Sequence, residues 1–166
     1  MKLTIKDITL IAILSVILFV QEEALNFLPN ISLTVFLIVL YSKKLGFFKT
    51  SIIVFIYCLL DNLVMGGFNI MYTPFMLIGW LLIPLLLNTV FKRVDKPLSL
   101  ALLGILFSLL YSWIFIIPNI MILHVDLFAY LISDIPFEIL LSTSSFLSLY
   151  LLYKPCSSLF YSQFLQ

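Results

Sequence analysis

Two acidic side chains, Asp134 and Glu138, lie four residues apart in a long apolar segment, with Pro136 between them. Residues at this spacing share one face of a helix. When two carboxylates lie so near each other in a low dielectric, either each raises the other's affinity for protons, or a cation or a hydrogen-bond donor lies between them. Pro136 removes one backbone hydrogen bond, and broken helices at membrane depth usually line a cavity. The motif predicts either a polar ligand site or a polar pair that joins two helices without a ligand.

Asp61 lies near the end of another apolar segment, shortly before Gly66 and Gly67. A charged residue inside a membrane-crossing helix costs roughly 2.5–3.5 kcal/mol on insertion scales, so it usually faces a cavity or a partner. Consecutive glycines permit a tight reversal of the chain. This stretch either contributes to a polar site or forms a simple turn in which neighbouring residues cap Asp61.

The segment 22–30 is polar but also carries leucine and phenylalanine, so it either folds back over a pocket or rests in the lipid headgroup layer.

Trp80 and Trp113 lie nearer the middle of their apolar segments than the ends. Aromatic residues at the ends of membrane spans usually form interfacial belts. The two tryptophans therefore either wall a pocket or belong to such belts.

His124 and Asp126 lie close together in sequence, but no nucleophile accompanies them. The sequence has no HExxH, phosphate-loop, hydrolase-elbow or CxxC motif, and its two cysteines, Cys58 and Cys156, are too scattered for a zinc site. We therefore expect no enzymatic activity, no metal and no cofactor, with His124 and Asp126 in a solvated loop.

The composition indicates how these residues are positioned. Of the 166 residues, 63 % are hydrophobic and 10 % are charged, whereas soluble domains average about 45–50 % apolar and about 25 % charged residues. An ordinary soluble enzyme and a disordered chain are excluded, and a net charge of +1 gives no reason to expect nucleic acid as a partner. We predict an all-α integral membrane protein, one domain over 1–166, with six transmembrane helices in the segments 8–20, 31–41, 47–64, 70–91, 98–122 and 127–153.

The basic residues predict the orientation. With six crossings, all nine fall on one side of the membrane: Lys2, Lys6, Lys43, Lys44, Lys49, Lys92, Arg93, Lys96 and Lys154. The positive-inside rule makes that side, and both termini, cytoplasmic. Most acidic residues fall toward the other side, which suggests a site that opens outward. Because Gln21-Glu22-Glu23 rather than small residues follow the first segment, we expect it to remain as an uncleaved helix.

The first segment starts after Lys6 and carries small or short residues along one face, namely Thr9, Ala12, Ser15 and Val16. Together with six short spans, inside termini and an outward pocket, this pattern resembles the S component, the substrate-binding subunit, of energy-coupling-factor (ECF) vitamin transporters. Members of that family typically show an Ala-x-x-x-Ala face there, and here Val16 replaces the second alanine. Small residues let helices approach closely. In the family this face docks on a transmembrane T component.

The resemblance implies a multi-pass protein of a prokaryotic plasma membrane that binds a vitamin or vitamin precursor in its outer half. Two cytoplasmic ATPases and the T component would drive transport, with the lipid bilayer as surroundings. The implied docking residues are Thr9, Ala12, Ser15 and Val16. The implied substrate-binding residues are Glu22, Glu23, Asn26, Asp61, Asn62, Asn69, Tyr72, Trp80, Trp113, Asn119, His124, Tyr130, Asp134 and Glu138.

Two other functions are compatible with the span count. A structural membrane protein such as the rod-shape-determining D protein would need no polar pocket, so Asp61, Asp134 and Glu138 weigh against it. A small intramembrane enzyme would need a nucleophile or a metal cluster.

The predicted outer half contains no lysine or arginine, so an anionic substrate would find no ion-pair partner. Neutral or cationic substrates are favoured: cobalamin or related corrinoids first, then thiamine precursors and pyridoxine-like amines.

Overall fold

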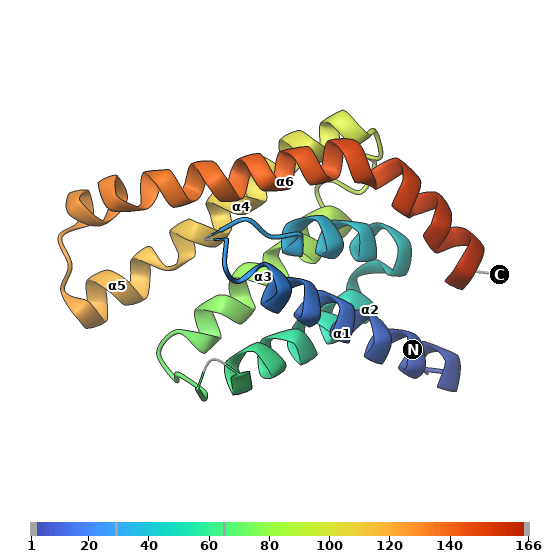
Figure 1. The fold of residues 1–166 in the computed structure, drawn as a ribbon, viewed down its shortest axis with the longest axis horizontal. Helices are drawn as coiled ribbons and strands as arrows, with labels where there is room; N and C mark the ends of the chain where they lie inside the picture. The colour runs from blue at the N-terminus through green and yellow to red at the C-terminus, as the bar shows by residue number, and fades with distance from the viewer. Residues whose placement is uncertain (1–2, 29, 65, 165–166) are drawn as a thin grey trace.

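The computed structural model describes residues 3–28, 30–64 and 66–164. Every regular element in these ranges is a helix, and Figure 1 shows their arrangement. Lys2 lies outside the described residues. The helices are α1 (Ile5–Leu25), α2 (Thr34–Val64), α3 (Thr73–Asn88), α4 (Pro97–Ile114), α5 (Ile116–Leu123) and α6 (Leu127–Phe164).

The predicted all-α, multi-pass membrane character agrees with the lengths and hydropathy of these helices. Within the described ranges, four helical stretches are long and apolar enough to cross a membrane: α1, α2, the α4–α5 stretch 97–121, and α6. The apolar helix α3 is shorter, with 16 residues. Helix α4 packs along α6, α2 packs against α3, and α1 packs against α2.

Helix α2 contains most of the predicted segment 31–41 and all of the segment 47–64. The chain bends between these two parts without an intervening loop. Gly46 adopts φ 78° and ψ −179° at the bend, a conformation that L-residues with a side chain rarely adopt. The Lys43 ammonium donates to the carbonyl oxygens of Phe91 at 3.0 Å and Lys92 at 3.2 Å. It also forms a 3.5 Å ion pair with Asp95. The bend is thereby tied to the connection between α3 and α4.

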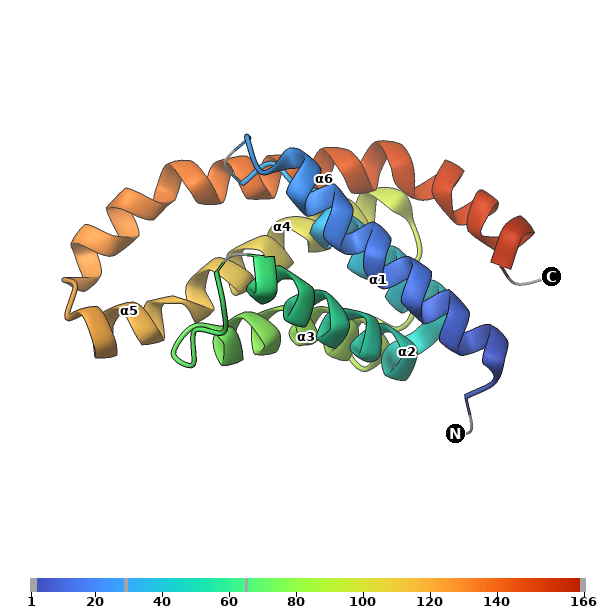
Figure 2. The same cartoon turned by 60° about the horizontal axis from the view of Figure 1, so that its bottom comes forward.

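The predicted segment 98–122 is divided at Phe115 into α4 and α5. Pro118 provides the physical reason, because a proline ring clashes with the carbonyl four residues earlier, here that of Ile114. In contrast, α6 continues through Pro136 and Pro155 as one helix. The break expected at Pro136 is absent, and α6 instead follows the curved path visible in Figure 2, as proline-containing helices commonly do.

The two ends of the bundle differ in charge. Lys49 pairs with Asp7 at 2.5 Å, which joins the start of α1 to the part of α2 that follows the bend. The Lys43–Asp95 pair joins the bend to the α3–α4 connection. Figures 1 and 2 place both chain ends on the same side of the molecule and the α5–α6 turn on the opposite side. The structure thus gathers several of the predicted basic groups at one end.

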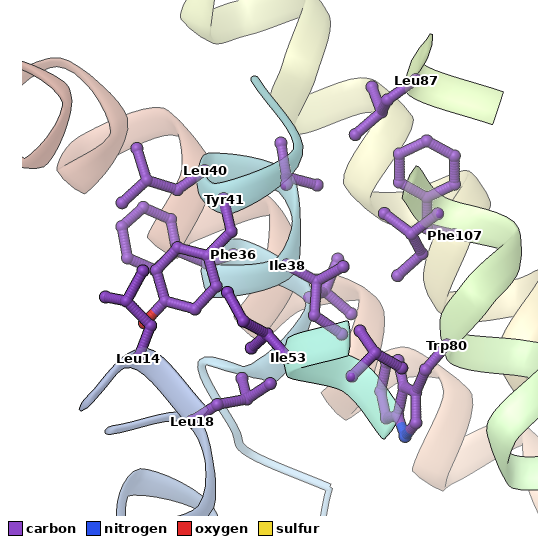
Figure 3. Packing of buried hydrophobic residues seen from close by; sticks show 14 of the residues in the cluster. Leu14, Leu18, Phe36, Ile38, Leu40, Tyr41, Ile53, Trp80, Leu87 and Phe107 are labelled. Atoms are coloured by element: carbon purple, nitrogen blue, oxygen red, sulfur yellow. The ribbon is translucent and has the colours of Figure 1, made fainter. Parts of the chain in front are cut away.

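The core lies between α1, α2, α3 and α4, where Leu18, Ile38, Ile53, Trp80 and Phe107 are almost completely buried (Figure 3). Outside this core the helices expose many large apolar side chains, as expected for a lipid-facing surface.

Close helix contacts depend on small residues elsewhere in the bundle. A Cβ built on Gly104 of α4 would lie 2.5 Å from Leu149 Cδ1 of α6, so any larger residue would require the Leu149 side chain to move. One turn later the Ser108 and Ser145 hydroxyl oxygens lie 2.8 Å apart.

Candidate functional site

Two adjoining hollows open at the end of the molecule opposite the basic cluster. The first has a volume of about 330 Å³ and the second about 230 Å³. Asn30, Tyr111 and Leu141 line both, so the hollows share a common wall. The other residues of the first are Glu22, Leu25, Asn26, Leu28, Ile31, Ser32 and Trp80, and those of the second are Ser112, Phe115, Asn119, Tyr130 and Asp134.

An aromatic stack forms one wall. The Trp80 and Tyr111 rings lie 3.7 Å apart at 21°, and Tyr57 meets Trp80 edge-on at 6.5 Å. Gly79 makes room for the stack, because a Cβ there would lie 2.8 Å from Tyr111 Cδ2. The buried Trp80 indole N–H makes no hydrogen bond of good geometry with the described residues, although the Tyr111 side chain lies close to it. A ligand in the first hollow therefore meets a flat aromatic surface.

An acidic wall stands beside this stack. Glu22 accepts hydrogen bonds from the Thr34 hydroxyl and, at 3.2 Å, from the Gln21 amide. The same Gln21 amide donates to Thr34 at 2.8 Å, and its oxygen accepts from the Leu33 N–H at 2.9 Å. Thr34 is completely buried. These bonds hold the end of α1 against the start of α2 and orient Glu22 at the cavity.

Two further acids lie near Glu22. Asp61 is 9 % exposed and is close enough to Glu22 and Glu23 for their charges to interact. One carboxylate oxygen of Glu23 is buried without a hydrogen-bond partner among the described residues. Neither Glu23 nor Asp61 lines either hollow, and no lysine, arginine or histidine occurs among the described lining residues. The local charge is therefore negative if the acids are ionised.

The second hollow combines several polar side chains. Asp134 accepts a hydrogen bond from the Ser112 hydroxyl. Asn119 accepts one from the Tyr72 hydroxyl at 3.2 Å, and its amide donates to the Phe115 carbonyl at 2.8 Å. Tyr130 completes the polar lining. This arrangement offers a carboxylate, a hydroxyl and an amide to a ligand without any positive charge.

Six predicted binding residues line the two hollows, and Tyr72 supports them through Asn119. Those six are Glu22, Asn26, Trp80, Asn119, Tyr130 and Asp134. Glu138 does not line either hollow; it is half-buried, and one of its oxygens has no partner among the described residues.

Other predicted residues lie apart from the hollows. Trp113 is 49 % exposed, so it is the neighbouring Tyr111 that forms the wall. Asn62 accepts from the Thr73 hydroxyl at 2.5 Å and donates to the Cys58 carbonyl at 2.8 Å, which ties α2 to α3. Asn69 lies in the exposed 66–72 connection and accepts from the Met71 N–H.

His124 and Asp126 have structural roles at the α5–α6 turn. His124 ends α5 in a left-handed conformation with φ 52°, and Asp126 accepts from the Ala129 N–H at 3.0 Å near the start of α6. A helix-capping carboxylate of this kind is common. The geometry gives no indication of a catalytic pair, and no group of three metal-ligating side chains occurs within the described ranges.

The predicted docking face of α1 is divided by the structure. Thr9, Ala12 and Val16 are exposed, whereas Ser15 is completely buried and donates to the Ile11 carbonyl at 2.8 Å. Ser15 therefore packs inside the bundle and is unavailable to a partner.

Sequence reasoning missed Tyr111, Ser112, Ser32 and the apolar lining residues outside the predicted segment 22–30 as members of the site. Tyr111 lies mid-segment like Trp113, so its aromatic character was visible in the sequence. What distinguishes the two is the contact with Gly79 from another helix, which no local pattern reveals.

Comparisons with known proteins found no significant match: no protein-family model, no characterised protein and no solved structure matches the chain.

The Thr34 hydroxyl provides a test of the acidic wall. Thr34→Val keeps the side-chain shape but leaves the Glu22 carboxylate without its closest donor. Losing a partner of a buried polar group costs about 1–3 kcal/mol, so we expect a lower melting temperature for the purified protein. Thr9→Val is the matched control, since the exposed Thr9 hydroxyl only donates to the Ile5 carbonyl of its own helix. Equal melting temperatures for both variants would contradict the proposed importance of the network.

Proposed function

We propose that this chain is the substrate-binding S component of an ECF-type vitamin importer. The observation that carries the proposal is the cavity, in which a tryptophan–tyrosine stack and carboxylates converge without any basic residue. Small-molecule sites typically combine an apolar or aromatic lining with a few placed polar groups. A membrane scaffold of the rod-shape-determining D type has no need of such a cavity, so the binding function is favoured.

In this proposal the chain crosses a prokaryotic plasma membrane six times with both termini in the cytoplasm. The six crossings are α1, the two parts of α2 on either side of Gly46, α3, α4 with α5, and α6. The position of the bend near the α3–α4 connection supports this path. The cluster of basic residues at that end supports a cytoplasmic assignment under the positive-inside rule.

The substrate is a small vitamin-like molecule that is neutral or cationic. Carboxylates at Glu22 and Asp134 attract hydrogen-bond donors and positive charge, and the Trp80–Tyr111 stack suits an aromatic ring or a cation. A hollow of about 330 Å³ is at the lower end of the usual range for ligand pockets. The volume therefore favours thiamine- or pyridoxine-type amines over the larger corrinoids.

The chain itself performs no chemical reaction in this proposal. A transmembrane T component binds the exposed residues Thr9, Ala12 and Val16 on α1, where small side chains allow close helix contact. Two cytoplasmic ATPases supply the energy for release of the substrate inward.

Ligand binding can be followed through Trp80, because the protein has only two tryptophans. In a Trp113→Phe variant, we expect thiamine or pyridoxine to change the fluorescence emission of Trp80. In the reciprocal Trp80→Phe variant, the exposed Trp113 should report no change. Native mass spectrometry of the purified chain tests cobalamin and any co-purified molecule in parallel. Absence of binding of all these vitamins, with folded protein, would refute the proposed substrate classes.

The carboxylates of α6 provide a matched pair of variants. Asp134→Asn should weaken binding of the vitamin detected by Trp80 by about tenfold or more, since losing a hydrogen bond to a charged group costs roughly 1.5–3 kcal/mol. Glu138→Gln should leave affinity nearly unchanged, because Glu138 lies outside both hollows. Melting temperatures of both variants separate lost affinity from lost folding. A larger effect at Glu138 would place the site elsewhere on α6.

The orientation is tested by labelling single cysteines in cells, in a background without Cys58 and Cys156. Asn69→Cys should react with a membrane-impermeant maleimide added outside, and Lys92→Cys should react only after the membrane is permeabilised. Both positions are exposed in the structure, so accessibility within the protein is matched. The reverse pattern would overturn the cytoplasmic assignment.

A further inference from the structure

A separate hollow of about 500 Å³ lies between the start of α4 and the later part of α6, at the basic end of the molecule. Two lysines, Lys96 and Lys154, line it together with apolar and aromatic residues. The remaining lining residues are Pro97, Leu98, Tyr150 and Leu151. This hollow shares no described residue with the first and second hollows of the candidate site.

A second, mostly apolar hollow of about 250 Å³ continues along the same pair of helices toward the middle of the bundle. It is lined by Ile105 of α4 and by Ser142, Thr143, Phe146 and Leu147 of α6. The Phe146 and Tyr150 rings lie 6.0 Å apart and nearly parallel, so they connect the two hollows. Together the hollows form what we call the α4–α6 groove.

The length of the α4–α6 groove is close to that of one lipid chain. Lys154 and Ser142 are twelve residues apart on α6, which corresponds to about 18 Å at a rise of about 1.5 Å per residue. Half of a typical hydrocarbon core measures about 15 Å. A molecule with its head at Lys154 therefore reaches the far end of the groove with one acyl chain.

The charge at the head of the groove is positive. Lys96 and Lys154 are exposed, and neither ammonium group forms a hydrogen bond or an ion pair with the described residues. The nearby acid is Asp95, which pairs with Lys43 at 3.5 Å. The exposed Lys92 and Arg93 lie in the same α3–α4 connection. The head of the groove thus presents free ammonium groups to an anion.

We propose that the α4–α6 groove binds one anionic phospholipid of the membrane. Its phosphate pairs with Lys96 and Lys154, and one acyl chain packs along Leu98, Leu151, Leu147 and Phe146. Basic pockets between membrane helices on the cytoplasmic side are suited to anionic headgroups. Lysine side chains near helix ends extend to the interface, where these headgroups lie. The inference goes beyond the proposed vitamin binding and does not depend on it.

The test compares lipid binding by the full chain in native mass spectrometry. Phosphatidylglycerol and phosphatidylcholine with identical acyl chains are added separately, and inorganic phosphate is a third probe. We expect one phosphatidylglycerol to bind preferentially. The double variant Lys96→Gln/Lys154→Gln should lose about tenfold or more of that affinity, given typical contributions of basic residues near anionic lipid. The double variant Lys6→Gln/Lys44→Gln changes the net charge equally at the same end and should retain it.

A second variant tests the acyl part of the groove. Leu147→Trp should fill the groove and weaken phosphatidylglycerol binding while both lysines remain. Leu102→Trp places the same residue on the exposed surface of α4 and should leave binding unchanged. Melting temperatures confirm that each variant is folded. Equal binding of the two lipids, equal loss in the Lys6/Lys44 control, binding of phosphate alone as tightly as lipid, or a second copy of the chain covering the groove would each overturn the proposal.

Discussion

The hydrogen bonds that join Gln21 and Glu22 to Thr34 and Leu33 are the interaction on which the candidate site depends. In hydrocarbon surroundings polar groups cannot exchange partners with water, so a satisfied buried network is costly to break. This network holds the end of α1 against the start of α2, and residues 26, 28 and 30–32 between the two helices line the first hollow. It also holds Glu22 at the cavity, so the same bonds that stabilise the fold position a functional carboxylate.

The opposite end of the bundle uses charge differently. There the acids are neutralised by lysines: Asp7 by Lys49 and Asp95 by Lys43. Each pair joins two segments distant in sequence, so these ion pairs fasten the bend of α2 and the α3–α4 connection. Glu22 lines the first hollow and, like the nearby Glu23 and Asp61, has no such cationic partner among the described residues. The ion-paired acids thus join segments of the bundle, whereas the unpaired Glu22 lines the first hollow.

The all-helical class and most helix positions were predictable from apolar run lengths, because a bilayer requires about 20 such residues per crossing, and four of the described helical stretches have that length and hydropathy. The separation of 31–41 from 47–64 was predicted, but a bend at Gly46 without a loop was not, because the contacts of Lys43 with the α3–α4 connection are not visible in a local pattern. Asp134 was found from its chemistry. The role of Tyr111 in the cavity wall and the burial of Ser15 were not predicted. Both depend on which neighbouring helix approaches the residue, and the sequence pattern does not contain that information.

The unpaired acids also bear on selectivity. A buried carboxylate without a counter-ion is unfavourable, because desolvation penalises the charge. A cationic or donor-rich ligand removes part of this penalty when it enters the cavity, whereas an anion would increase it. The aromatic stack adds to the same preference, since the face of Trp80 or Tyr111 attracts positive charge. The proposed preference for a small amine therefore follows from two independent features of the wall, the sign of its charge and the nature of its flat surface.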